Sequence, residues 1–129
     1  MKRVGIYARE APGRTGRARL DRQVAGLAAQ VGREPGWHHV ATYGDLDFGP
    51  AAGRPGLGRL LAEASGRIDI VVVDGYGRLS ANRHERDGLL AHLGAIGVRA
   101  VVLRPSGGRR LAGLVANLAL ADVIGTAAG

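Results

Sequence analysis

Apolar residues along this chain follow two different spacings, which alternate from the first residues to about position 103. Short segments rich in β-branched and aromatic residues are typical of strands, and longer segments with apolar residues every three or four positions are typical of amphipathic helices. The predicted strands are residues 3–8, 37–43, 68–73 and 98–103. The predicted helices between them are residues 20–32, 53–66 and 83–97.

This alternation of strands and helices indicates the fold class. Strands that alternate with helices form α/β domains, with a mainly parallel central sheet and flanking helices. The apolar run that ends at Val73, just before Asp74 and Gly75, is typical of a central strand buried on both faces. A chain of 129 residues is expected to form one domain, residues 1–129, that buries roughly two-thirds of its unfolded surface.

Residues 111–126 differ from the other predicted helices because apolar side chains occupy nearly the whole circumference. Asn117 and Asp122 are the main polar interruptions. A helix that is apolar on all sides must be buried, and this segment is too short and too rich in glycine and alanine to anchor in a membrane. We therefore expect residues 111–126 to form the interface of a homodimer.

Two predicted loops interrupt the regular pattern. Residues 11–18 contain Pro12 and Gly13, and residues 44–55 contain Gly49 and Pro50. Both follow predicted strands, and ligands of open α/β sheets bind outside the carboxyl ends of the strands. The two segments are therefore either active-site loops or ordinary connections.

The composition adds a strong positive charge. The formal net charge is +7, and Lys2 is the only lysine among the 18 basic residues. Arginine forks match phosphate oxygens well, which favours a polyanionic partner. A GC-rich genome also writes arginine in place of lysine, so the choice of arginine alone carries less weight than the charge.

Other features of the composition restrict the chemistry. Cysteine is absent, which excludes disulfides and thiolate metal sites. Adjacent His38 and His39 would point to opposite faces of a strand, so no metal and no cofactor is expected. The chain has neither a membrane-spanning run nor a signal-peptide core, and a cytoplasmic protein is expected.

Four short motifs occur in an order that is found in one protein family. Tyr7 and Arg9 close the first predicted strand, and residues 20–23 followed by Leu27 open the first helix. The third motif is Arg54, Pro55, Gly56 and Leu57, and the fourth is Arg78, Leu79 and Ser80. Together they resemble the catalytic domain of serine recombinases, the resolvases and invertases, over about residues 2–124.

The resemblance implies a mechanism. In this family a serine attacks a DNA phosphodiester and forms a phosphoserine link, and arginines stabilise the charge on the phosphoryl oxygens without a metal. The matching catalytic positions here are Tyr7, Arg9, Gln23, Arg54 and Arg78. The residues expected to contact DNA phosphates are Arg9, Arg14, Arg17, Arg54 and Arg78.

The chain departs from the family pattern at several catalytic positions. Ala11 stands where the nucleophilic serine is expected, and a methyl group cannot attack phosphorus. Gly77 replaces the acidic residue, and Ala81 the second arginine, of the family's Asp-Arg-Leu-x-Arg element. Asp122 and Val123 stand where a glutamate-arginine pair is expected on the last helix.

These departures predict a recombinase-like protein without strand exchange. We expect a dimeric, DNA-associated or regulatory pseudoenzyme that lacks a helix-turn-helix reader. One alternative is a protein-protein interaction module with no DNA role, and another is residual strand exchange or unrelated phosphoester chemistry. Ser80 is the nearest serine in the motifs, but the family carries a small residue there without using it as a nucleophile.

Overall fold

The computed structural model describes residues 1–47, 49–103 and 123–124. Strands and helices alternate along the chain, and two short 3₁₀ helices, η1 and η2, lie between them. The elements in chain order are β1 (Lys2–Glu10), α1 (Gly16–Gly32), β2 (Trp37–Leu46), η1 (Ala51–Gly53), α2 (Pro55–Glu63), β3 (Ile70–Val73), η2 (Tyr76–Arg78), α3 (Arg83–Ala95), β4 (Arg99–Val102) and β5 (Val123–Ile124).

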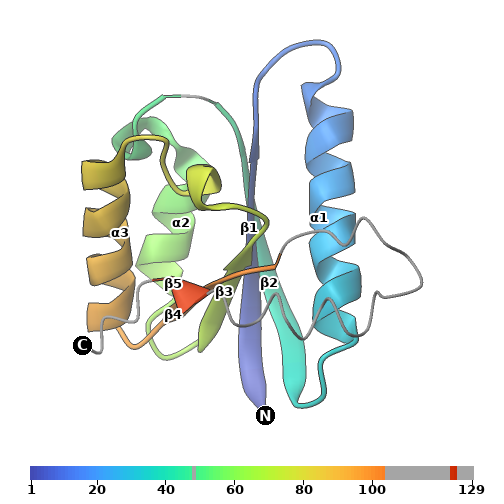
Figure 1. Ribbon diagram of the computed structural model, residues 1–129, viewed down its shortest axis with the longest axis vertical. Helices are drawn as coiled ribbons and strands as arrows, with labels where there is room; N and C mark the ends of the chain where they lie inside the picture. The colour runs from blue at the N-terminus through green and yellow to red at the C-terminus, as the bar shows by residue number, and fades with distance from the viewer. Residues whose placement is uncertain (48, 104–122, 125–129) are drawn as a thin grey trace.

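The strands form one sheet in the order β2-β1-β3-β4-β5. The first four strands are mutually parallel, and β5 runs antiparallel to β4. Helix α1 covers one face of this sheet, and α2 and α3 cover the other (Figure 1). The predicted α/β fold with a mainly parallel sheet and flanking helices is confirmed.

Alternation along the strands divides the core into two layers. Val4 and Ile6 of β1 face α1, where they pack in a cluster with Leu27 and Val31. Tyr7 points to the opposite face and joins the cluster formed with α2 and α3. Because successive strand residues face opposite sides, the next residue of this parity, Arg9, lies on the same face as Tyr7.

Strand β2 extends further than the sequence indicates. It continues to Leu46, because residues 44–46 pair in register with Ala8, Arg9 and Glu10 of β1. The prediction that residues 44–46 belong to a loop is therefore wrong, and tertiary pairing outweighs the weak strand propensity of Gly44 and Asp45. The extension carries Asp45 to the carboxyl edge of the sheet.

Helix α2 approaches β2 closely at its first turn. Pro55 is its first residue, a position where the missing N–H is not needed. A Cβ atom at the next residue, Gly56, would collide with the backbone carbonyl oxygen of Gly44. Glycine at this position therefore allows the start of α2 to rest against the end of β2.

The predicted helix at residues 111–126 lies outside the described residues, except at positions 123 and 124. Val123 and Ile124 form β5 and pair with Val101 and Ala100 of β4. At these two positions the helix prediction is wrong. Both residues are β-branched, and pairing satisfies backbone groups along the outer edge of β4.

An ion pair joins the first residues of β1 to the segment before β3. The Asp69 carboxylate accepts hydrogen bonds from the Arg3 backbone N–H at 2.8 Å and from Arg3 Nε at 3.1 Å. Arg3 also donates to the Gly66 carbonyl oxygen at 2.7 Å. The hydrogen bonds from Arg3 lower the pKa of Asp69 from 3.8 to about 2.

This shift predicts a pH dependence of stability. Because the folded-state pKa is lowered, the stabilisation from the Asp69 carboxylate is present in full above about pH 5 and is lost as the pH falls toward 2. We expect the difference in unfolding free energy between the wild type and Asp69→Asn to shrink across that range. Urea unfolding at several pH values measures it, and a difference that stays constant down to about pH 2 would contradict the assignment.

Candidate functional site

A hollow of about 390 Å³ opens at the carboxyl edge of the sheet. Arg9 lines it from β1, Gly49 and Pro50 from the loop between β2 and α2, and the remaining residues from the turn before α3 and the first turn of that helix. Those remaining residues are Ser80, Ala81, Asn82, His84 and Glu85. The loop after β2 thus contributes Gly49 and Pro50 to the hollow, whereas none of residues 11–18, the loop after β1, lines it.

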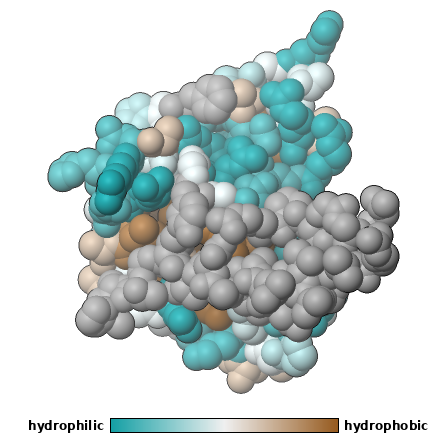
Figure 2. All heavy atoms as spheres, in the orientation of Figure 1, coloured by the Kyte–Doolittle hydropathy of each residue, from teal (hydrophilic) through white to brown (hydrophobic). Residues whose placement is uncertain are grey.

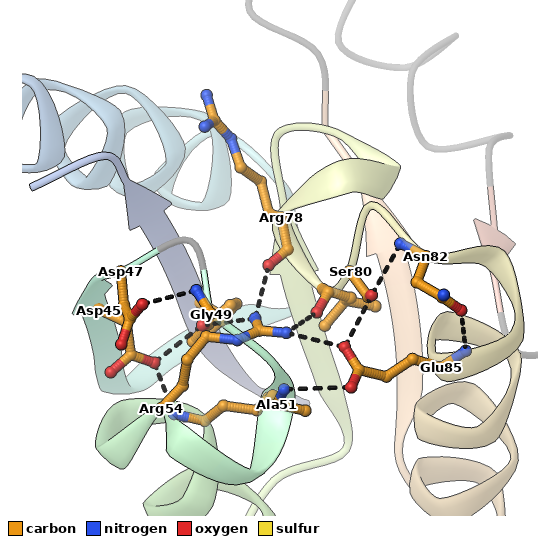
Figure 3. A network of polar contacts seen from close by, with 12 residues as sticks. Asp45, Asp47, Gly49, Ala51, Arg54, Arg78, Ser80, Asn82 and Glu85 are labelled. Carbon is orange, nitrogen blue, oxygen red and sulfur yellow. Dashed lines mark hydrogen bonds and ion pairs between the residues drawn. The ribbon is translucent and has the colours of Figure 1, made fainter.

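Arg54 lies at the centre of the polar network beside this hollow (Figure 3). Its side chain is almost fully buried, with 1% of the residue exposed. Nη2 donates to the Leu79 carbonyl oxygen at 2.6 Å, and Nη1 donates to the Arg78 carbonyl oxygen at 3.2 Å. Nη2 also lies 3.5 Å from Glu85 Oε1. Among the described residues, Nε of Arg54 meets no acceptor.

Tyr7 connects Arg54 to a buried carboxylate. Its hydroxyl accepts a hydrogen bond from Arg54 Nη1 at 3.2 Å and donates to Asp45 Oδ2 at 2.8 Å. Burial raises the pKa of the Tyr7 phenol, with a further contribution from Asp45. The phenol therefore stays protonated at neutral pH and acts as a fixed donor to Asp45.

Asp45 caps helix α2 from outside the helix. Its two carboxylate oxygens accept hydrogen bonds from the backbone N–H groups of Gly56 at 2.7 Å and Leu57 at 2.9 Å. The first N–H groups of a helix have no partner within it and carry partial positive charge, so a carboxylate there is favourable. Asp45 therefore holds α2, and with it Arg54, against β1 and β2.

Arg9 and Gln23 meet at the end of β1. The Gln23 side-chain oxygen accepts from the Arg9 backbone N–H at 3.0 Å, and its amide group donates to the Arg9 carbonyl oxygen at 3.1 Å. Gln23 thus binds both main-chain groups of Arg9, a residue that also lines the hollow. Burial lowers the pKa of Arg9, and the positive charge of Arg54 lowers it further.

Arg78 also contacts the end of β1 but points away from Arg54 (Figure 3). Its Nη1 donates to the Arg9 carbonyl oxygen at 2.8 Å, and Nη2 lies 3.4 Å from Glu10 Oε2. Its Nε donates to Asp74 Oδ1 at 2.7 Å. An acidic partner for Arg78 is therefore present at position 74, although Gly77 occupies the position where the sequence motif led us to expect one.

The remaining predicted site residues lie outside this network. Ala11 follows β1 directly, and its carbonyl oxygen packs against Gly16 at the start of α1. Arg14 and Arg17 are exposed, and Arg17 Nε lies 3.3 Å from Asp21 in the next turn. The structure thus brings Tyr7, Arg9, Gln23, Arg54 and Arg78 together, and leaves Arg14 and Arg17 exposed outside this network.

The surface around these residues is polar. In Figure 2, hydrophilic residues gather over the upper half of the face in view, where Figure 1 places the carboxyl end of β1 and the start of α1. In the part of the chain that the structure describes, no helix is long and apolar enough to cross a membrane. Within the same residues, no three histidine or carboxylate side chains gather as a metal site.

Sequence reasoning missed Asp45 and Glu85. Asp45 directly precedes the end of β2, so its place at the carboxyl edge of a strand was the available signal. Glu85 follows Asn82 by three residues at a helix start, a spacing typical of a capping box. Neither signal reveals that both carboxylates belong to the network that surrounds Arg54.

Comparison with known proteins identifies the family. The family model described as "Resolvase, N terminal domain" matches residues 4–121. The chain therefore belongs to the resolvase N-terminal domain family. None of the curated proteins matches the chain.

Solved structures of recombinase catalytic domains share the fold. The C-terminal catalytic domain of ISC1926 TnpA, an IS607-like serine recombinase, has a TM-score of 0.70 and 25% identity, covering 90% of this chain and 77% of that chain. The N-terminal catalytic domain of TP901-1 integrase has a TM-score of 0.68 and 23% identity, covering 91% and 93%. A resolvase family site-specific recombinase from Streptococcus pneumoniae has a TM-score of 0.65 and 15% identity, covering 92% and 86%.

The Asp45 cap gives a direct test of how the site is held. Replacing Asp45 with Asn removes the charge and places an amide N–H donor opposite backbone N–H groups at the start of α2, which are donors themselves. One buried hydrogen bond is therefore lost. We expect Asp45→Asn to lower the unfolding free energy by about 2 kcal/mol. Urea unfolding followed by circular dichroism measures the change.

The matched control is Asp87→Asn, which makes the same replacement at an exposed position of α3. That variant is expected to stay within about 0.5 kcal/mol of the wild type. Equal stabilities for the two variants would show that Asp45 does not hold α2 in place.

Proposed function

We propose that this protein binds the phosphate backbone of duplex DNA through the arginines at the carboxyl edge of its sheet and does not cut it. The observation that carries this proposal is the pairing of two features at one site. Arg9 and Arg54 lie close enough for their charges to interact, and Arg9 lines an open hollow. The position that the family motif assigns to the nucleophile holds Ala11.

The chemistry of the site supports binding without cleavage. Guanidinium groups stabilise the negative charge of a phosphate whether or not a bond is broken. Cleavage by this family's route needs an oxygen nucleophile, and alanine has none. Ala81 lines the same hollow in place of a second arginine, so the positive charge available to a transition state is also reduced.

Ser80 does not supply the missing nucleophile in this arrangement. Its hydroxyl donates to Glu85 Oε1 at 2.8 Å and accepts from the Asn82 backbone N–H at 3.0 Å. The residue is 2% exposed. This buried hydroxyl donates one hydrogen bond and accepts another, so it links the turn before α3 to the helix itself.

A second candidate function is a protein-protein interaction module with no DNA role. The ion pairs favour it, because Arg78 is paired with Asp74 and Glu10 and Arg54 lies beside Glu85. In this alternative the arginines stabilise the fold and the surface keeps the protein soluble. The homodimer interface expected at residues 111–126 stays a prediction under both functions.

Salt-dependent binding separates the two functions. Fluorescence anisotropy of a labelled duplex of about 40 base pairs should report binding whose logarithmic affinity falls linearly with the logarithm of salt concentration, with a slope of about −0.9 for each phosphate contact. We expect Arg14→Gln and Arg17→Gln each to reduce the magnitude of that slope by about 1.

Arg33→Gln is the matched control, because Arg33 is exposed and follows α1 at the amino edge of the sheet. Its slope should equal that of the wild type. Absence of binding to the duplex even at low salt would reject the DNA function and favour the interaction module.

Restoring the nucleophile alone is not expected to restore cleavage. Ala11→Ser supplies a hydroxyl but leaves Ala81 without a guanidinium. We expect Ala11→Ser to form no covalent protein-DNA complex on a supercoiled plasmid or a duplex, as judged by denaturing gel electrophoresis. A covalent complex with Ala11→Ser that is absent from the wild type would show that the rest of the site is still competent for chemistry.

A further inference from the structure

The hydrogen bonds at the start of helix α3 differ from those of a complete capping box. The Asn82 side chain accepts from the Glu85 backbone N–H at 2.9 Å, as in a capping box. In a capping box the glutamate side chain returns a bond to the backbone N–H of the capping residue. Here that N–H donates instead to Ser80 Oγ at 3.0 Å, so the Glu85 carboxylate is not needed to cap its own helix.

The released carboxylate crosses to the loop between β2 and α2 (Figure 3). Its Oε1 accepts from Ser80 Oγ at 2.8 Å and lies 3.5 Å from Arg54 Nη2. Its Oε2 accepts from the Ala51 backbone N–H at 3.2 Å. One carboxylate is thus contacted by a hydroxyl, a guanidinium and a backbone N–H group. These three groups come from three different segments of the chain.

These three donors are also the kinds of group that bind phosphate. Hydroxyl, guanidinium and backbone N–H groups all donate to phosphate oxygens in proteins. The hydrogen bond from Ser80 and the bond from Ala51 lower the pKa of Glu85, so an anion occupies the position at neutral pH. The Glu85 side chain is 31% exposed and lines the hollow of about 390 Å³. The carboxylate therefore has room to rotate out of the anion position into solvent.

We propose that the Glu85 carboxylate is an internal, displaceable occupant of the anion position formed by Ala51, Arg54 and Ser80, and that a phosphate group competes with it. The proposal rests on the proposed phosphate-binding function and adds its regulation. With Glu85 in place the loop is tied to α3 and the anion position is occupied. When phosphate enters, Glu85 turns to solvent and its bond to Ala51 is broken.

Competition has a measurable consequence. The apparent affinity of a ligand is reduced by the fraction of molecules whose site is open. Weakening the internal occupant raises that fraction without adding any contact to the ligand. Glu85→Gln removes the charge of the occupant, and Glu85→Asp keeps the charge but shortens its reach by one methylene group.

The experiment is an NMR titration at constant ionic strength with inorganic phosphate and, separately, with dimethyl phosphate as a diester. The backbone N–H of Ala51 and the Nε–H of Arg54 report on the site. We expect both Glu85→Gln and Glu85→Asp to bind phosphate at least about fivefold more tightly than the wild type. Asp87→Asn, an exposed change on the same helix, should stay within about twofold.

The two Glu85 variants separate competition from a general charge effect, because Glu85→Asp has the net charge of the wild type. Equal phosphate affinities for the wild type and Glu85→Asp would overturn the proposal. It would also be overturned if neither reporter responds to phosphate in any of the proteins. Tighter phosphate binding by both variants, combined with no binding to duplex DNA, would support the internal competition and reject the DNA function.

Discussion

The buried guanidinium of Arg54 sets the strongest constraint on this fold, because a buried charge with several N–H donors must find acceptors inside the protein. Its partners come from three places: the Tyr7 hydroxyl on β1, the carbonyl oxygens of Arg78 and Leu79 after β3, and Glu85 on α3. The side chain therefore fixes how the beginning of α2 lies relative to β1, the η2 turn and α3. Removing a buried partner would leave a donor of Arg54 without its acceptor, which is costly inside a protein.

The contacts of Arg54 that serve the fold must be distinguished from contacts that would serve a ligand. Tyr7, Asp45 and Arg54 form a chain of hydrogen bonds that positions α2 whether or not DNA is bound. The presence of Arg54 is thus accounted for by the fold as well as by a ligand. Arg9 lines the hollow, and Gln23 binds the backbone N–H and the carbonyl oxygen of Arg9. The case for a phosphate ligand therefore depends on Arg9 together with the hollow more than on the number of arginines.

The parts of the structure that depend on local signals were predictable from the sequence. The strands and helices between residues 2 and 103 were predicted in the correct order, and the resemblance to serine recombinases brought Tyr7, Arg9, Gln23, Arg54 and Arg78 to one region. Features that depend on distant contacts were not predictable. The extension of β2 to Leu46 needs its pairing with β1, and the strand at Val123 and Ile124 needs β4 beside it. Asp45 and Glu85 act through side chains that reach other segments, which sequence spacing does not reveal.

We have proposed that the arginines at the carboxyl edge of the sheet receive DNA phosphate at a site where Ala11 stands in the position of the nucleophile. The most direct measurement follows the guanidinium Nε–H resonances of Arg9, Arg54 and Arg33 by NMR while an intact duplex is added. We expect the signals of Arg9 and Arg54 to move, the signal of Arg33 at the opposite edge to stay in place, and the duplex to remain uncut. Binding of the duplex with no response from Arg9 and Arg54 would contradict the proposed phosphate site.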